Sequence, residues 1–205
     1  MEFITQFGSV TLLIPLAILL AGALWHYEGR RAAMTFMVPM TGCMSAMLLL
    51  KLYFISCGTG QAYGITSPSG HTASSTFVLG SVAVVVATHV RRYKAWMVLG
   101  LSTALILAIA ISRVLLGAHT VEEVVAGFAV GVVTLLLFVV PYMRTVRRPI
   151  RLKVMAGAFL AVAALAYGVP SSAEQYIKMM SQHLRTETGE CGNEQMRSSP
   201  SSVYG

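Results

Sequence analysis

The sequence contains few charged residues and no aspartate. Charged residues make up 11% of its 205 residues, hydrophobic residues make up 56%, and the mean hydropathy is +0.70. A soluble domain carries about 25% charged residues, so too few are present to cover a water-facing surface. The three cysteines, at positions 43, 57 and 191, have no metal-ligand spacing. This composition excludes a soluble globular protein, a disordered chain and a disulfide-rich secreted module, and it leaves a polytopic membrane protein.

Long apolar stretches occupy most of the chain. A membrane-spanning helix needs about 20 mostly apolar residues. Six stretches qualify, at residues 7–25, 32–55, 71–90, 95–111, 120–141 and 152–169. They do not alternate between polar and apolar residues as barrel strands do. We therefore expect an all-α bundle of about six transmembrane helices, with one domain over 1–170 and a polar, flexible tail over 171–205.

The basic residues gather in alternate turns of this predicted bundle. Most of the 15 lysines and arginines follow the first, third and fifth spans. They are Arg30, Arg31, Arg91, Arg92, Lys94, Arg144, Arg147, Arg148, Arg151 and Lys153. Basic turns remain in the cytoplasm, so both termini and the other turns are expected outside. The net charge of +7 is thus mainly a topology signal, and no nucleic-acid partner is expected. The first span has no basic segment before it, which favours an uncleaved span over a signal peptide.

Polar residues cluster where the spans reach the predicted outer face. Ionisable groups at spans are costly and by default mark function. The group comprises Lys51, Ser69, Gly70, His71, Arg113, His119, Glu122 and Glu123.

These residue types suit phosphoryl transfer. Lys51 and Arg113 supply positive charge for an anion, and Gly70 lets backbone amides at a helix N-terminus approach it. Histidines can act as acid, base or nucleophile near neutral pH. His119 and Glu123 are four residues apart, so on a helix they share one face and the carboxylate can orient the imidazole. Each residue taken alone also has a structural interpretation, such as a snorkelling role for the lysine.

Two runs of residues resemble signatures of a known family. Residues 68–71 read Pro-Ser-Gly-His, and residues 112–119 read Ser-Arg, five residues, His. Together they resemble the type 2 phosphatidic acid phosphatase superfamily, and Lys51 fits the lysine of its first signature. The resemblance implies that His119 is the nucleophile that becomes phosphorylated, and that His71 protonates the leaving oxygen.

The remaining roles also follow from the resemblance. It implies that Lys51, Ser69, Gly70 and Arg113 hold phosphate oxygens, that Glu123 orients the nucleophile, and that neither metal nor cofactor is needed. The expected function is hydrolysis of a lipid phosphate or diphosphate at the outer face of the cell membrane. Candidate substrates are polyprenyl pyrophosphate, phosphatidic acid, phosphatidylglycerol phosphate and lipid A. The partners are this substrate and membrane lipids, and the oligomeric state is left open.

Two positions depart from the family pattern. Gly58-Thr59 stands where the first signature has Arg-Pro, and Glu123 stands where the third has aspartate, with Glu122 as its competitor. A phosphotransferase with the same intermediate, or a non-catalytic relative that binds anionic lipids, therefore remains an alternative. His26 and His89 are expected at the inner face, away from the reactive side. The Gly127–Gly131 pair suits close helix packing.

Overall fold

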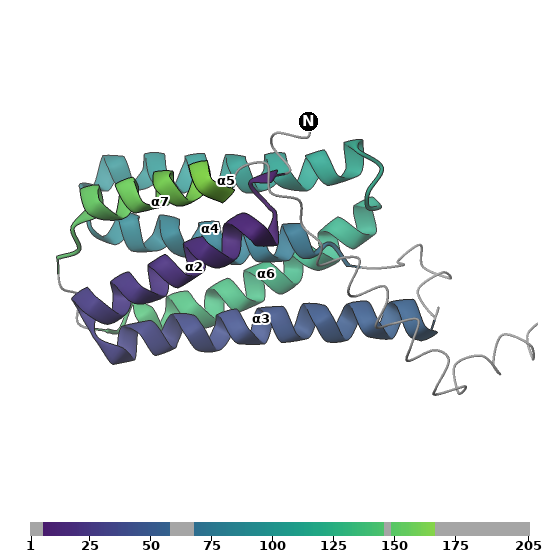
Figure 1. Ribbon diagram of the computed structural model, residues 1–205, viewed down its shortest axis with the longest axis horizontal. Helices are drawn as coiled ribbons and strands as arrows, with labels where there is room; N and C mark the ends of the chain where they lie inside the picture. Colours follow the sequence, from purple (N-terminus) through teal and green to yellow (C-terminus); the bar gives the residue numbers. More distant parts are fainter. Residues whose placement is uncertain (1–5, 58–67, 146–148, 167–205) are drawn as a thin grey trace, which may run out of the picture.

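The computed structural model describes residues 6–57, 68–145 and 149–166, and every regular element in them is helical (Figure 1). In chain order the elements are α2 (Val10–Ala23), η1 (Leu24–Glu28), α3 (Arg30–Cys57), α4 (Gly70–Thr88), α5 (Arg92–Leu115), α6 (Val121–Tyr142) and α7 (Leu152–Ala166). The expected all-α architecture is confirmed. The expected domain boundary at 170 and the tail over 171–205 lie outside the described residues.

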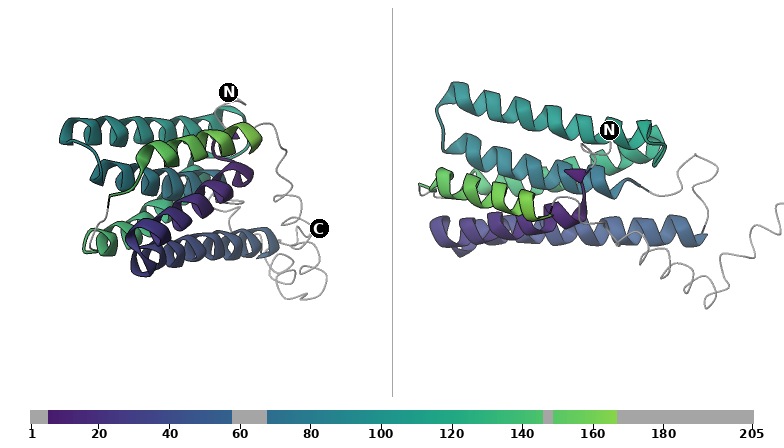
Figure 2. Two further views of the ribbon diagram at one scale, coloured as in Figure 1. Left: turned by 60° about the vertical axis from the view of Figure 1, so that its left-hand side comes forward. Right: turned by 45° about the horizontal axis from the view of Figure 1, so that its top comes forward.

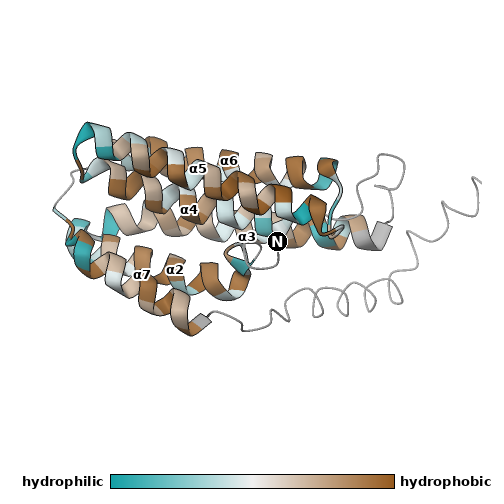
Figure 3. Ribbon diagram, turned by 90° about the horizontal axis from the view of Figure 1, so that it is seen from above, coloured by the Kyte–Doolittle hydropathy of each residue, from teal (hydrophilic) through white to brown (hydrophobic). Residues whose placement is uncertain are grey.

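Five of these helical segments are long and apolar enough to cross a membrane, which fits a multi-pass membrane protein. They are Val10–Glu28, Arg30–Phe54, Gly70–Thr88, Arg92–Leu115 and Val121–Tyr142. The sixth expected span is present as a shorter apolar helix, Leu152–Leu165. At 1.5 Å per residue the 15 residues of α7 extend about 22 Å, less than a hydrocarbon core of about 30 Å. Hydrophilic residues collect at the two ends of the bundle and apolar residues lie between them (Figure 3).

Helix α4 is the central element and packs against α2, α3, α5 and α6. Its buried side includes small and polar residues such as Ser74, Ser75 and Ser81, which allow neighbouring backbones to come close. α6 comes close to α4 at Gly131. A Cβ at this position would lie 2.6 Å from Thr76 Cβ and 2.7 Å from the Ala73 carbonyl oxygen. α7 contacts α2 at the side of the bundle (Figure 2).

An aromatic cluster joins three helices. Phe36 of α3 stacks on Phe77 of α4 with ring centroids 5.3 Å apart, and it meets Phe138 of α6 edge-on at 5.6 Å. Tyr142 stacks on Phe138 at 5.0 Å. All four rings are at most 1% exposed. Such pairs favour fixed ring geometry, so the cluster sets how these helices are placed relative to one another.

The helices run so that the bundle has two distinct ends. We call one the site end: it contains the C-terminal turns of α3 and α5 and the N-terminal turns of α4 and α6 (Figure 1, right). The other is the basic end, with the N-terminal turns of α3 and α5 and the C-terminal turns of α4 and α6.

Candidate active site

All of the predicted site residues lie at the site end. Lys51 is near the C-terminus of α3, and Arg113 is in the last turn of α5. Ser69 is the N-cap of α4, with Gly70 and His71 as its first two residues. The remaining two stand at the start of α6, with His119 just before its N-cap and Glu123 in its first turn.

His119 and Glu123 form a buried pair. The imidazole Nδ1 lies 2.6 Å from the carboxylate Oε2, and the two side chains are 7% and 3% exposed. The sequence predicts that both share a helical face, but His119 lies outside the helix, one residue before the N-cap Thr120. The turn into α6 therefore creates the contact. The carboxylate accepts a hydrogen bond from Nδ1–H, and this bond sets the tautomer in which Nε2 carries no proton.

Thr120 holds the same carboxylate from the backbone side. Its amide donates to Glu123 Oε2 at 3.3 Å, and the Glu123 amide donates to Thr120 Oγ1 at 3.3 Å. This is a capping box, in which the N-cap and the third helical residue satisfy each other. Sequence reasoning missed Thr120, although Thr-x-x-Glu before an apolar run is the recognised pattern for such a cap.

The turn after α5 explains the spacing between Arg113 and His119. The amides of Ala118 and His119 donate to the Arg113 carbonyl oxygen at 3.1 and 3.3 Å. Gly117 takes a φ of 62°, which glycine adopts without the steric cost of a side chain. The chain thus folds back on the end of α5, and the histidine backbone lies against the arginine backbone.

Ser69 connects α4 to the start of α6. It is fully buried, and its amide donates to the Glu123 carbonyl oxygen at 3.0 Å. Its hydroxyl accepts a hydrogen bond from Thr72 Oγ1 at 3.0 Å. On the other side of Ser69, a Cβ at Gly127 of α6 would overlap the Ser69 carbonyl oxygen. The predicted close-packing role of Gly127 and Gly131 is therefore confirmed: α6 approaches α4 over both glycines.

Lys51 lies beside the start of α4. A Cβ added to Gly70 would stand 3.5 Å from Lys51 Cε and 3.8 Å from Nζ. The lysine is only 8% exposed, so it does not extend away from the protein as a snorkelling lysine does. Its ammonium and the amides at the N-terminus of α4 place positive charge in the same position, which favours an anion.

Three charged residues are buried at this end, one of them being Lys51. Arg113 is 9% exposed and Glu123 is 2% exposed, whereas Glu122 is exposed to its surroundings. Burying a charge costs free energy unless partners compensate it. The half-buried His71 stands at the same end, in the first turn of α4. The pair at Gly58-Thr59 lies outside the described residues.

Among residues 6–57, 68–145 and 149–166, no group of three or more His, Cys, Asp or Glu side chains could hold a metal ion. The site of the described structure thus consists of two histidines, one buried acid, two buried cations and the amides at the N-terminus of α4.

The fold and this end of the bundle define a polytopic helical membrane protein with a buried histidine–carboxylate pair and two buried cations at the same end. Residues 50–148 match the family model of the PAP2 superfamily, so this part of the chain is a PAP2 superfamily domain. The domain spans every predicted site residue from Lys51 to Glu123, and the resemblance seen in the sequence is confirmed. Searches of the curated proteins and of the solved structures gave no match to this chain.

Proposed function

We propose that this protein is an integral membrane phosphatase that hydrolyses a lipid phosphate or diphosphate through a phosphohistidine intermediate. The observation that carries the proposal is the His119–Glu123 pair, 2.6 Å apart and buried, at the same end of the bundle as Lys51 and Arg113. The PAP2 superfamily domain around them supports phosphate-ester chemistry.

The first half of the reaction transfers the phosphoryl group to the protein. His119 Nε2 forms a bond to phosphorus as the bond from phosphorus to the leaving oxygen breaks. His71 donates a proton to that oxygen, which departs as an alcohol or a lipid phosphate. Glu123 stabilises the positive charge that the imidazole develops, because its carboxylate accepts a hydrogen bond from Nδ1–H.

The second half returns the histidine to its starting state. His71, now neutral, takes a proton from water, and the water oxygen attacks phosphorus as the bond to His119 breaks. Inorganic phosphate leaves. Lys51, Arg113, the Ser69 hydroxyl and the Gly70 amide bind the equatorial oxygens in both steps, where the transition state spreads its charge.

The placement of the site supports a lipid substrate. The site residues stand at the ends of helices that are long and apolar enough to cross a membrane. The ends of such helices lie near the head groups, so a phosphate would reach the site while its tails remain in the bilayer. Basic residues lie in the α4–α5 turn, at the start of α3 and just after the end of α6. All of these segments are at the opposite end of the bundle from the site. By the positive-inside rule, this distribution supports a site at the extracytoplasmic face.

Phosphate release by the purified protein tests the proposal. The wild type in detergent should release phosphate from at least one of phosphatidic acid, phosphatidylglycerol phosphate, a polyprenyl pyrophosphate and lipid A. The His119→Ala variant should show no release above the blank, and acid-labile, alkali-stable phosphoprotein should form only when His119 is present. His26→Ala is the matched control, since His26 is exposed near the basic end.

The same assay separates the alternatives. Phosphate appearing on an added lipid acceptor instead of water identifies a phosphotransferase. Tight substrate binding without turnover in the wild type rejects the enzyme and leaves a lipid-binding relative. Normal turnover by His119→Ala rejects the nucleophile.

A further inference from the structure

A furrow opens between α3 and α6 at the basic end, away from the site. Its outer part is a cavity of about 660 Å³ between the first turns of α3 and the C-terminal end of α6. Arg30 and Arg31 line it from α3, and Arg144 lines it from the residues that follow α6. All three arginines are exposed. The outer part of the furrow therefore presents three guanidinium groups from two walls.

The inner part of the furrow is apolar. A second cavity of about 490 Å³ is lined by Val38, Gly42 and Leu137, among others. Thr35 and Pro141 line both cavities, so the two are continuous. The residues of the second cavity lie further along α3 and earlier along α6, so the furrow runs from the basic end toward the middle of the bundle.

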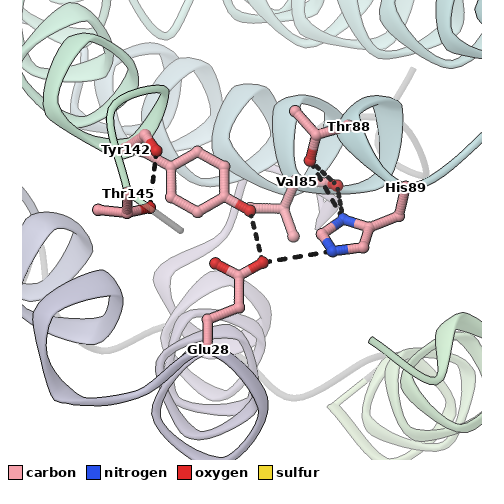
Figure 4. Close-up of polar contacts among 6 residues, drawn as sticks. All are labelled: Glu28, Val85, Thr88, His89, Tyr142 and Thr145. Carbon is pink, nitrogen blue, oxygen red and sulfur yellow. Dashed lines mark hydrogen bonds and ion pairs between the residues drawn. The ribbon is translucent and has the colours of Figure 1, made fainter. Parts of the chain in front are cut away.

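The acid nearest in sequence does not neutralise these arginines. Glu28 ends η1, and its Oε1 accepts from Tyr142 Oη at 2.9 Å and lies 3.3 Å from His89 Nε2 (Figure 4). Its side chain is fully buried, with 0% exposed. In the described part of the chain, no carboxylate lies within ion-pair distance of Arg30, Arg31 or Arg144.

The same contact holds the two walls together. Gly29, with a φ of 100°, separates Glu28 from the first residue of α3, and Tyr142 is the last residue of α6. The hydrogen bond between Tyr142 and Glu28 therefore joins the start of the α3 wall to the end of the α6 wall. His89, at the C-terminal end of α4, also contacts Glu28 and so connects α4 to the two walls. Its Nδ1 lies 2.8 Å from the Val85 carbonyl oxygen (Figure 4).

We propose that this furrow is a binding site for an anionic phospholipid of the leaflet at the basic end. The phosphodiester head group contacts the three arginines, and one acyl chain lies along the apolar cavity. Arginine binds phosphate oxygens through paired N–H donors, and basic pockets between membrane helices suit anionic head groups. The start of α3 adds the positive end of a helix dipole.

The furrow is separate from the candidate active site. The 22 residues of α6 extend about 33 Å between the two ends, at 1.5 Å per residue. A lipid in the furrow is thus a bound neighbour at the opposite face and not a substrate at the histidines.

Native mass spectrometry of the full chain with added phosphatidylglycerol tests the head-group contact. The wild type should retain phosphatidylglycerol in preference to phosphatidylcholine. In the Arg30→Gln/Arg31→Gln/Arg144→Gln variant the apparent Kd should rise on the order of 100-fold. The matched control, Arg91→Gln/Arg92→Gln/Lys94→Gln, removes three exposed cations from the same end outside the furrow and should retain the lipid.

A second pair of variants tests the apolar part without changing charge. Gly42 lines the inner cavity, and a Cβ there would meet nothing within 4 Å. Gly42→Phe should fold, fill the furrow and weaken phosphatidylglycerol binding at least tenfold. Gly100→Phe, at an equally open position on α5, should leave binding unchanged.

Three results would overturn the proposal. The first is retention of phosphatidylcholine as strong as that of phosphatidylglycerol. The second is a loss of phosphatidylglycerol in the control triple variant as large as that in the arginine variant. The third is unchanged phosphatidylglycerol binding in both the arginine variant and Gly42→Phe. Loss of the lipid in Arg113→Ala, with retention in the arginine variant, would instead assign the bound lipid to the active site and would also reject the furrow.

Discussion

The amide of Ser69 donates a hydrogen bond to the main-chain carbonyl of Glu123, with nitrogen and oxygen 3.0 Å apart. Ser69 belongs to the residues that begin α4, and Glu123 belongs to the first turn of α6. This bond therefore links the residues proposed to bind phosphate to Glu123, which holds the proposed nucleophile His119. Changes on either side of it should affect the same chemistry.

Replacing Glu123 with glutamine should lower kcat on the order of 10²-fold or more. The neutral amide cannot stabilise the charge that His119 develops, and general acid–base support of this kind contributes about 10²- to 10⁴-fold. The measurement is steady-state phosphate release. Glu122→Gln is the control, since Glu122 is exposed, and it should remain within roughly twofold of wild type. A larger effect at Glu122 would transfer the orienting role to that residue.

Removing the Thr120 hydroxyl should destabilise the start of α6. Thr120→Ala loses the side-chain half of the capping box, which costs about 0.5–2 kcal/mol. Thermal unfolding in detergent should show a lower midpoint, and kcat should fall because the first turn of α6, which carries Glu123, is held less firmly. Thr120→Ser should restore both values. If Thr120→Ser restores the unfolding midpoint but not kcat, the cap does not position the site.

Adding one methyl group at Gly127 should separate α6 from the start of α4. The new Cβ would overlap the Ser69 carbonyl oxygen, and overpacking of this kind costs about 1–3 kcal/mol. Gly127→Ala should therefore lower both the unfolding midpoint and phosphate release. Gly100→Ala, on α5 with nothing within 4 Å, should be neutral or stabilising, because alanine favours a helix by about 1 kcal/mol over glycine.

Removing the Tyr142 hydroxyl should lower stability without changing the chemistry. Tyr142→Phe deprives the buried Glu28 carboxylate of a donor at 2.9 Å, and hydrogen bonds to charged groups contribute about 1.5–3 kcal/mol. The kcat of the folded fraction should remain unchanged, since the contact lies at the basic end. The penalty should shrink in a Glu28→Gln background, because the two residues act as one unit. The exposed Tyr93→Phe is the control.

Much of the architecture could be predicted from the sequence. The low content of charged residues and the long apolar stretches indicated a helical membrane protein, because a bilayer accepts only segments whose backbone polar groups are satisfied internally. The runs at 68–71 and 112–119 indicated the family and the chemistry. The Gly127–Gly131 spacing indicated close packing, although its partner helix could not be known.

Other features depended on contacts between distant segments. The sequence placed His119 on a helical face, but the capping box of Thr120 and Glu123 begins the helix after it. The sixth apolar stretch was expected as a full span, whereas the described helix α7 has 15 residues.

The sequence by itself indicated a multi-pass membrane protein, the residues that could bind a phosphate, and the gathering of basic residues in alternate turns. Composition, spacing and charge are local properties of the chain. They act through the surrounding water or lipid and do not depend on which helices pack together. Only the tertiary structure decided that Ser69 meets Glu123 and that Tyr142 meets Glu28, which is 114 residues away. The first contact depends on the close approach of α4 and α6 over Gly127 and Gly131, and the second depends on the packing of α6 beside η1 and α3. Both are properties of the assembled helices.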